Sequence, residues 1–105
     1  MLQRVPYDQL VVAFDWNLPD KLNMAAQVCD DWAARDPDRV AIIDLTDGRC
    51  DLSYGEMRSL SDRLALFLTA RGVQPGDRVG VLLSQGIWCA ISHIAIWKIG
   101  AISIP

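Results

Sequence analysis

The chain has 105 residues, which is enough for one small domain with its own core. Hydrophobic residues make up 51% of the chain and charged residues 22%, a composition that excludes a disordered polypeptide. The net charge is −3, and acidic and basic residues are interspersed along the sequence. We therefore expect no nucleic acid partner, because nucleic acid binding requires a basic patch.

The three cysteines, Cys29, Cys50 and Cys89, are odd in number and widely spaced. This usage predicts reduced, mostly buried thiols in a cytoplasmic protein. His93 is the only histidine, so the four-ligand spacing of a zinc site is missing. We expect no metal ligand in this chain.

A membrane span has to be considered for the apolar run 87–105. About 13 residues of it are helical in character, and they would reach only ~20 Å across a hydrocarbon core of ~30 Å. His93, Lys98 and Gly100 also interrupt the run. We expect no membrane span, and the first residues lack the layout of a signal peptide.

The first part of the chain divides at about residue 22. Residues 1–22 form an irregular leader with one short helix over 7–13, which the sequence 17–20 breaks. Asn23 is placed to cap a following helix, and Asp36-Pro37 ends that helix. Residues 40–45 predict a strand, 46–48 a turn and 49–52 a partner strand, together an antiparallel hairpin.

The remainder predicts a strand–helix–strand unit that follows a long helix. Ser53 and Glu56 form a capping box, and Gly72 closes the helix. The apolar run 79–83 predicts a strand that is buried on both faces. A nearly all-apolar helix is expected over 87–99, and a second strand, parallel to the first, over 101–105. The predicted apolar stripe of the long helix is Met57, Leu60, Leu64, Phe67 and Leu68, with Arg58, Asp62 and Arg63 turned away from it. We expect an α/β fold, the N-terminal part of a layered domain.

Several segments carry a resemblance to a known family. They are Leu52-Ser-Tyr-Gly-Glu-Met57, Ser61-Asp-Arg-Leu-Ala65, Gly72-Val-Gln-Pro-Gly-Asp-Arg-Val-Gly-Val-Leu-Leu83 and Lys98-Ile-Gly-Ala-Ile-Ser-Ile-Pro105. In this order and spacing they resemble the start of an adenylate-forming, AMP-binding enzyme, a superfamily that includes acyl-CoA synthetases and peptide-synthetase adenylation domains. The helix before Gly100 is most similar to the acetyl- and medium-chain acyl-CoA synthetase branch.

The resemblance implies a ligase several times longer than this chain, of which residues 23–105 are a truncated N-terminal portion. It implies a small carboxylic acid, ATP, Mg²⁺ and coenzyme A as substrates and cofactors of the full-length enzyme, and for the acyl-CoA branch a place in fatty acid metabolism. In the family, the phosphate loop, the ribose-binding carboxylate and the catalytic lysine lie downstream. We therefore expect no catalytic, cofactor-binding or metal-binding residue here, and no adenylation activity from the isolated chain.

The alternative is a non-catalytic α/β module that acts through protein–protein contact or has no function. The apolar helix over 87–99 favours it if a partner covers that surface, and self-association of the chain is a related expectation.

The side chains with possible chemistry have plainer interpretations. His93 with Cys89 at i−4 lacks a third group to orient it, so a packed or surface histidine is expected. We expect a solvated helix face at Asp30-Asp31 and a helix-ending turn at Asp36 to Asp38, in place of a metal site. We expect a plain strand-to-helix loop at Ser84-Gln85-Gly86, in place of a ligand crevice. Trp32, Trp88 and Trp97 read as core anchors, with an uncovered interface as the alternative for the last two.

Overall fold

The computed structural model describes residues 5–105. It contains mixed helices and strands in the order α1, η1, α2, β1, β2, α3, β3, α4 and β4. None of the helices in this part of the chain is long and apolar enough to cross a membrane. The α/β fold expected from the sequence is confirmed.

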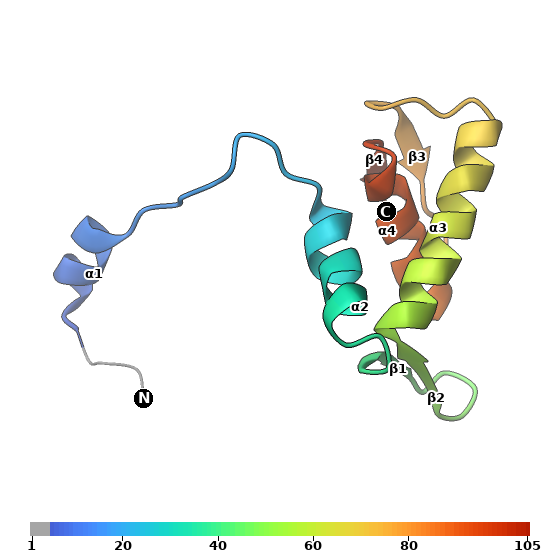
Figure 1. Cartoon of the computed structure of the whole chain (residues 1–105), viewed down its shortest axis with the longest axis horizontal. Coiled ribbons are helices and arrows are strands. Elements are labelled where there is room, and N and C mark those ends of the chain that lie inside the picture. Colours follow the sequence, from blue (N-terminus) through green and yellow to red (C-terminus); the bar gives the residue numbers. More distant parts are fainter. Residues whose placement is uncertain (1–4) are drawn as a thin grey trace.

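The leader extends away from the body of the molecule (Figure 1). Its helix α1 (Tyr7–Ala13) has the predicted bounds and buries no residue. The exposed apolar side chains that follow α1 include Phe14 and Trp16, whose rings meet edge to face. The leader accounts for much of the 50 Å long axis of the molecule.

The first helix of the body begins at Asn23, as predicted. The Asn23 Oδ1 atom accepts hydrogen bonds from the amides of Ala25 and Ala26. The helix continues as a π-helical segment η1 (Ala26–Asp30) and then as α2 (Asp31–Arg35). It ends before Asp36-Pro37, because the residue before proline is held out of the helical region.

The predicted antiparallel hairpin is confirmed. It consists of β1 (Val40–Asp44) and β2 (Cys50–Ser53), with an irregularity in the register between Val40 and Ile42. Both strands lie beside the start of α3 (Figure 1). The hairpin is a separate two-stranded sheet and shares no hydrogen-bonded strand with the second sheet.

The long helix α3 (Tyr54–Ala70) carries the predicted capping box. The Glu56 amide donates to Ser53 Oγ, and the Ser53 amide donates to Glu56 Oε2. Gly72 follows the helix with a φ of 94°, a conformation that glycine adopts without strain.

The buried face of α3 is rotated from the predicted stripe. The helix buries Met57, Ser61 and Ala65, and Leu60, Leu64 and Leu68 of the predicted stripe are partly buried. Phe67 is exposed under the guanidinium of Arg71, so the prediction is wrong for Phe67. Small side chains at 61 and 65 instead let the neighbouring helix approach.

The strand–helix–strand unit is confirmed, with β3 (Arg78–Gly80) parallel to β4 (Ile102–Ile104) through the crossover helix α4 (Ile87–Lys98). The prediction that residues 79–83 are buried on both faces is wrong for this chain. β3 spans three residues, and the Leu82 side chain just beyond it is 100% exposed. Among residues 5–105 β3 has one strand neighbour, so the apolar run lacks the cover that its composition predicts.

The core lies between η1, α3, α4 and the hairpin. Its buried members come from all four parts of the body. They are Ala25, Cys29, Leu52, Met57, Ile91 and Ile94.

Candidate functional site

A crevice of about 550 Å³ opens where the chain passes from β3 to α4. It lies between the loop Ser84-Gln85-Gly86 and the turn of the hairpin, and Leu83, Leu60 and Trp88 supply its apolar walls. This is the carboxyl end of a parallel strand, where open α/β sheets form their ligand crevices. Its described lining includes no histidine, lysine or arginine, so a phosphate would find no cation there.

Asp44 organises this crevice. One carboxylate oxygen accepts from the amide and the hydroxyl of Thr46, and the other accepts from the amide of Ile87 at 3.0 Å. Hydrogen bonds from the Thr46 side chain and amide, and from the Ile87 amide, lower the pKa of Asp44. The same carboxylate leaves no room beside Gly86, where an added Cβ would lie 3.0 Å from it.

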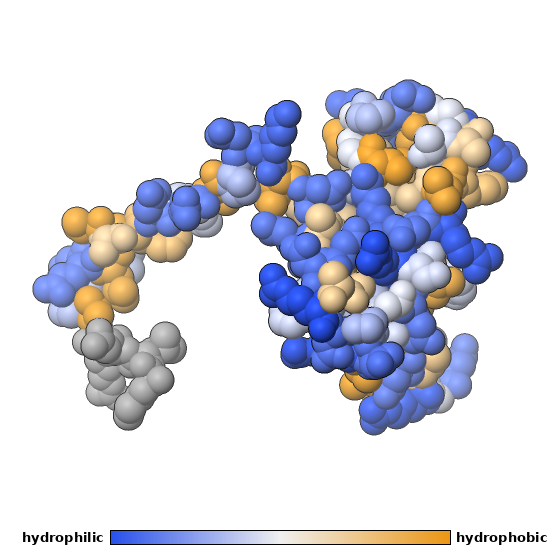
Figure 2. Space-filling view, viewed as in Figure 1, coloured by the Kyte–Doolittle hydropathy of each residue, from blue (hydrophilic) through white to orange (hydrophobic). Residues whose placement is uncertain are grey.

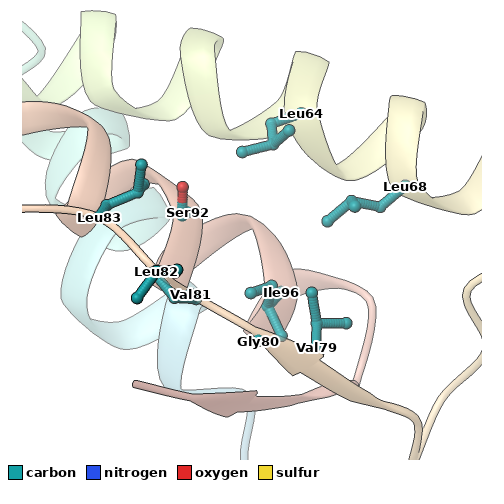
Figure 3. A pocket seen from close by; sticks show the side chains of 9 residues that line it. All are labelled: Leu64, Leu68, Val79, Gly80, Val81, Leu82, Leu83, Ser92 and Ile96. Atoms are coloured by element: carbon teal, nitrogen blue, oxygen red, sulfur yellow. The ribbon is translucent and has the colours of Figure 1, made fainter.

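An apolar groove of about 320 Å³ lies between α3 and β3. Leu64 and Leu68 point from α3 toward the backbone of β3, and Ile96 lies below them on α4 (Figure 3). Hydrophobic side chains gather at this end of the body (Figure 2). The groove has the chemistry of a packing surface, because among its described lining residues Ser92 is the only one with a polar side chain.

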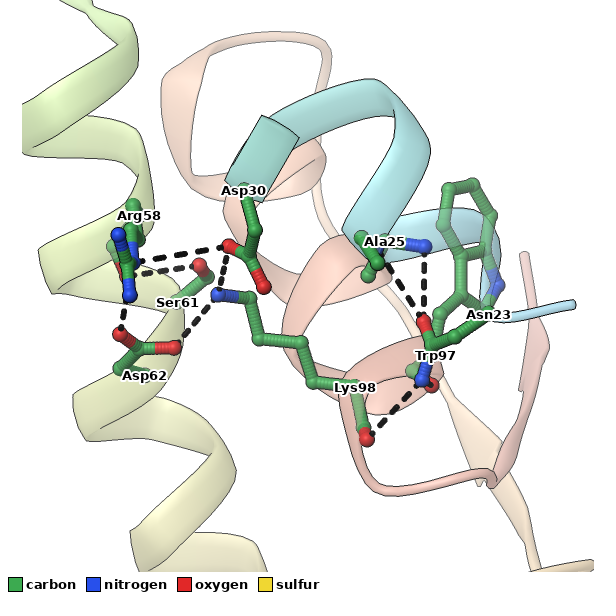
Figure 4. Close-up of polar contacts among 9 residues, drawn as sticks. Asn23, Ala25, Asp30, Arg58, Ser61, Asp62, Trp97 and Lys98 are labelled. Atoms are coloured by element: carbon green, nitrogen blue, oxygen red, sulfur yellow. Dashed lines mark hydrogen bonds and ion pairs between the residues drawn. The ribbon is translucent and has the colours of Figure 1, made fainter. Parts of the chain in front are cut away.

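A cluster of charges joins the three helices η1, α3 and α4 (Figure 4). Lys98 Nζ of α4 lies 2.5 Å from Asp30 Oδ1 of η1 and 2.5 Å from Asp62 Oδ1 of α3. Arg58 lies 4.0 Å from Asp30 and 3.8 Å from Asp62. The Lys98 side chain is only 10% exposed, so the two carboxylates replace the water that its ammonium group gives up.

This cluster corrects two expectations. Asp30 does not lie on a simple solvated helix face, because its carboxylate is paired with Lys98. Arg58 and Asp62 lie outside the apolar stripe, as predicted, but they join an ion-pair cluster that the sequence does not indicate. Burial acts to lower the pKa of Lys98, but its hydrogen bonds to Asp30 and Asp62 outweigh this and raise the pKa. Lys98 is committed to these carboxylates and is not free to bind a phosphate.

Asn23 provides a second connection to α4. While its Oδ1 atom caps η1, its Nδ2 atom donates to the carbonyl oxygens of Trp97 and Lys98 at 3.2 and 3.3 Å (Figure 4). One side chain therefore satisfies groups at the start of one helix and at the end of another. The sequence predicts only the first of these roles.

His93 packs at a tilt against the ring of Trp97, with centroids 5.8 Å apart, and is partly buried. This agrees with a packed histidine. Cys89 is partly buried too, and no hydrogen bond joins it to His93 in the described part of the chain. Cys29 is buried, and burial raises the pKa of its thiol. All three thiols are free, as expected, but Cys50 is exposed, so the prediction of mostly buried thiols is wrong for it.

Of the three tryptophans in the body, two are anchors and one is exposed. Trp32 stacks on Tyr54 and lies under Arg39, and Trp97 donates a hydrogen bond to Ser103. Trp88, the second residue of α4, is 63% exposed at the edge of the crevice. This contradicts its assignment to the core and agrees with the alternative of an uncovered interface.

The described residues do not fit the magnesium and phosphate chemistry of an adenylate-forming reaction. Residues 5–105 hold no group of three or more histidine, cysteine or acidic side chains placed to bind a metal. Loop 72–76 lies between a helix and a strand, so no helix N-terminus follows it to bind an anion. No catalytic step is therefore assigned to this part of the chain.

Comparison with known proteins gives a family for the chain. Residues 29–105 match the family described as AMP-binding enzyme. Three curated relatives are a salicyl-AMP ligase/salicyl-S-ArCP synthetase of Mycobacterium tuberculosis (40% identical over 73% of this chain), an acetyl-coenzyme A synthetase of Penicillium chrysogenum (35% over 83%) and a nonribosomal peptide synthetase of Emericella nidulans (32% over 92%).

The fold has a counterpart in a solved structure. An acyl-CoA synthetase of Brucella canis superposes with a TM-score of 0.80 and 27% identity over 92% of this chain. The match covers 20% of that protein, and the match to each of the three curated relatives covers 14%, 14% and 2% of its length. The sequence and fold together show that the chain belongs to the AMP-binding, adenylate-forming enzyme family and corresponds to its N-terminal part.

Proposed function

We propose that this chain is the N-terminal portion of an AMP-forming acid–thiol ligase. In the reaction, a carboxylate oxygen attacks the α-phosphorus of ATP and pyrophosphate leaves, giving an acyl-adenylate. The thiolate of coenzyme A then attacks the acyl carbon, and AMP leaves. The observation that supports this proposal best is the match of residues 29–105 to the AMP-binding enzyme family.

Within this proposal the chain is scaffold. The charge cluster and the core hold α3 and α4 together, and the crevice lacks the cation that ATP would require. We propose that the ATP, Mg²⁺ and thiol sites are formed by other parts of an adenylate-forming enzyme, and that the isolated 105 residues do not form acyl-adenylates. A cytoplasmic location remains a prediction.

The thiol acceptor is coenzyme A in this proposal, in line with the acetyl-coenzyme A synthetase relative and the acyl-CoA synthetase fold. A carrier-protein thiol is the second candidate, because the salicyl-AMP ligase relative is 40% identical. The exchange between ATP and labelled pyrophosphate tests the first half-reaction. A non-catalytic module remains the alternative.

The experiment uses the 105-residue chain alone and the same chain fused in place of the corresponding fifth of the Brucella canis enzyme. We expect no exchange with the chain alone and carboxylate-dependent exchange with the fusion. Exchange by the chain alone would contradict its role as scaffold. A folded but inactive fusion would favour the module.

A further inference from the structure

The free edge of β3 is the starting point. Val81 donates its amide to Ile104, and Asp77 accepts from Ile102, so the odd-numbered residues bond to β4. Alternation along a strand directs the backbone groups of Gly80 and Leu82 to the opposite edge. In residues 5–105 no strand pairs with that edge. An uncovered edge of this kind is a template for another strand.

The groove beside this edge has the shape that such a strand requires. Leu64 and Leu68 of α3 lie across the groove from the backbone of β3 (Figure 3). A strand placed there would pair with the backbone of β3 and bring one row of side chains against these leucines. Gly80 has no heavy atom within 4 Å of the position of an added Cβ, so a neighbouring backbone can approach closely.

The comparisons indicate what supplies the strand. The fold of this chain matches one fifth of an acyl-CoA synthetase at a TM-score of 0.80, so the arrangement of α3, α4 and β3 occurs inside a much larger protein. An apolar edge and an apolar groove fit an apolar strand better than a charged ligand, since the groove offers no charged side chain among its described residues.

We propose that the free edge of β3 and the groove under Leu64 and Leu68 bind a β-strand from the remaining part of an adenylate-forming domain, and that they do so even when that part is a separate polypeptide. This inference rests on the proposed function, and it adds the surface and the mode of binding. Gly80 and Leu82 provide the backbone contacts, and Leu64, Leu68 and Ile96 the apolar contacts.

The test pairs the whole 105-residue chain with the Brucella canis acyl-CoA synthetase from which the matching fifth has been removed, both expressed in one host. We expect a 1:1 complex on size-exclusion chromatography and at least tenfold slower amide exchange at Gly80 and Leu82. Leu82→Asp places a charge in the edge and should weaken the complex at least tenfold. Leu66→Asp is the matched control, because Leu66 is also exposed but does not line the groove.

If the shortened enzyme is insoluble without its partner, the fusion described above decides the matter by the same comparison. Slower exchange at Gly80 and Leu82 in the fusion, lost with Leu82→Asp and kept with Leu66→Asp, supports the proposal. Equal effects of the two variants, or unprotected amides in a folded fusion, would overturn it. A dimer of the chain alone that Leu82→Asp abolishes would identify a second copy as the occupant and also overturn it.

Pyrophosphate exchange, measured on the same samples, separates this proposal from the proposed function. Slow amide exchange at Gly80 and Leu82 without pyrophosphate exchange supports strand binding and contradicts the proposed ligase. Pyrophosphate exchange with unprotected amides at these two residues supports the ligase and contradicts strand binding.

Discussion

Asp44 and Ile87 are 43 residues apart, and the carboxylate of the first accepts a hydrogen bond from the amide of the second. The end of the hairpin thereby satisfies an amide in the first turn of α4, where no side chain of the preceding loop acts as a cap. The contact joins the hairpin to α4, the helix that connects the two strands of the other sheet.

Replacing Asp44 should destabilise the chain in a pH-dependent way. Because its pKa is lowered in the folded chain, its contribution is fully present above the ordinary value of 3.8 and is lost as the pH falls through the lower folded value. We expect Asp44→Ala to lower the melting temperature at pH 7 and to have a progressively smaller effect as the pH falls below 3.8. Asp47→Ala is the control, since Asp47 also lines the crevice. A difference between Asp44→Ala and the parent chain that does not shrink as the pH falls below 3.8 would contradict this explanation.

Removing the ammonium group of Lys98 should lower the free energy of unfolding more than removing an exposed cation does. Lys98→Met leaves Asp30 and Asp62 facing each other, and we expect a loss of about 1–3 kcal/mol in the free energy of unfolding, below the usual figure for a buried pair because Asp62 is partly exposed. Arg49→Met breaks the exposed pair with Asp51 and should have no measurable effect.

The stabilising effect of Lys98 should weaken at alkaline pH. The pKa of Lys98 is raised, so its contribution is complete below the ordinary value of 10.5 and is lost as the pH rises through the higher folded value. Denaturant titrations at pH 7 and pH 11.5 test this. The advantage of the parent chain over Lys98→Met should shrink at pH 11.5, and a constant advantage would contradict the ion-pair explanation.

The capping box at the start of α3 should stabilise the folded chain by an amount typical of helix caps. Ser53→Ala removes the acceptor for the Glu56 amide, and we expect a loss of about 1 kcal/mol. Ser59→Ala, at an exposed position in the same helix, should change stability by less than ~0.5 kcal/mol. Chemical denaturation followed by circular dichroism gives both values, and equal losses would refute the cap.

Gly86 should tolerate no side chain. Gly86→Ala would bring a Cβ to 3.0 Å from the Asp44 carboxylate, at a φ of 156° that side chains rarely adopt, so we expect a loss of at least ~1 kcal/mol. Gly80→Ala, with open space at its Cβ position, should be close to neutral. If Gly86→Ala in the Asp44→Ala background costs as much as it does alone, backbone strain rather than the carboxylate is responsible.

Local signals in the sequence predicted the elements well. The capping box, the cap at Asn23, the hairpin turn and the proline at 37 each act within a few residues, and all four are confirmed. The resemblance to adenylate-forming enzymes rested on the order of short motifs and is confirmed as well.

The long-range contacts could not be predicted in this way. Asp30 and Lys98 are 68 residues apart, and neither carries a sign of its partner. The exposure of Leu82 could not be predicted for a different reason. Its apolar character predicts a cover, and the sequence pattern does not reveal that this cover is absent from residues 5–105. The exposure of Trp88 agrees with the alternative interpretation of that residue, an uncovered interface.

The double role of Asn23 has a practical consequence for attaching anything to the N-terminus. The leader leaves the body at Asn23, and the hydrogen bonds of Asn23 hold this point against the last turn of α4. The crevice lies at the first turn of the same helix. Because α4 has 12 residues, its two ends are about 18 Å apart. An affinity tag, a fluorescent label or a fused domain ahead of residue 23 therefore joins the body at the end of α4 opposite the crevice.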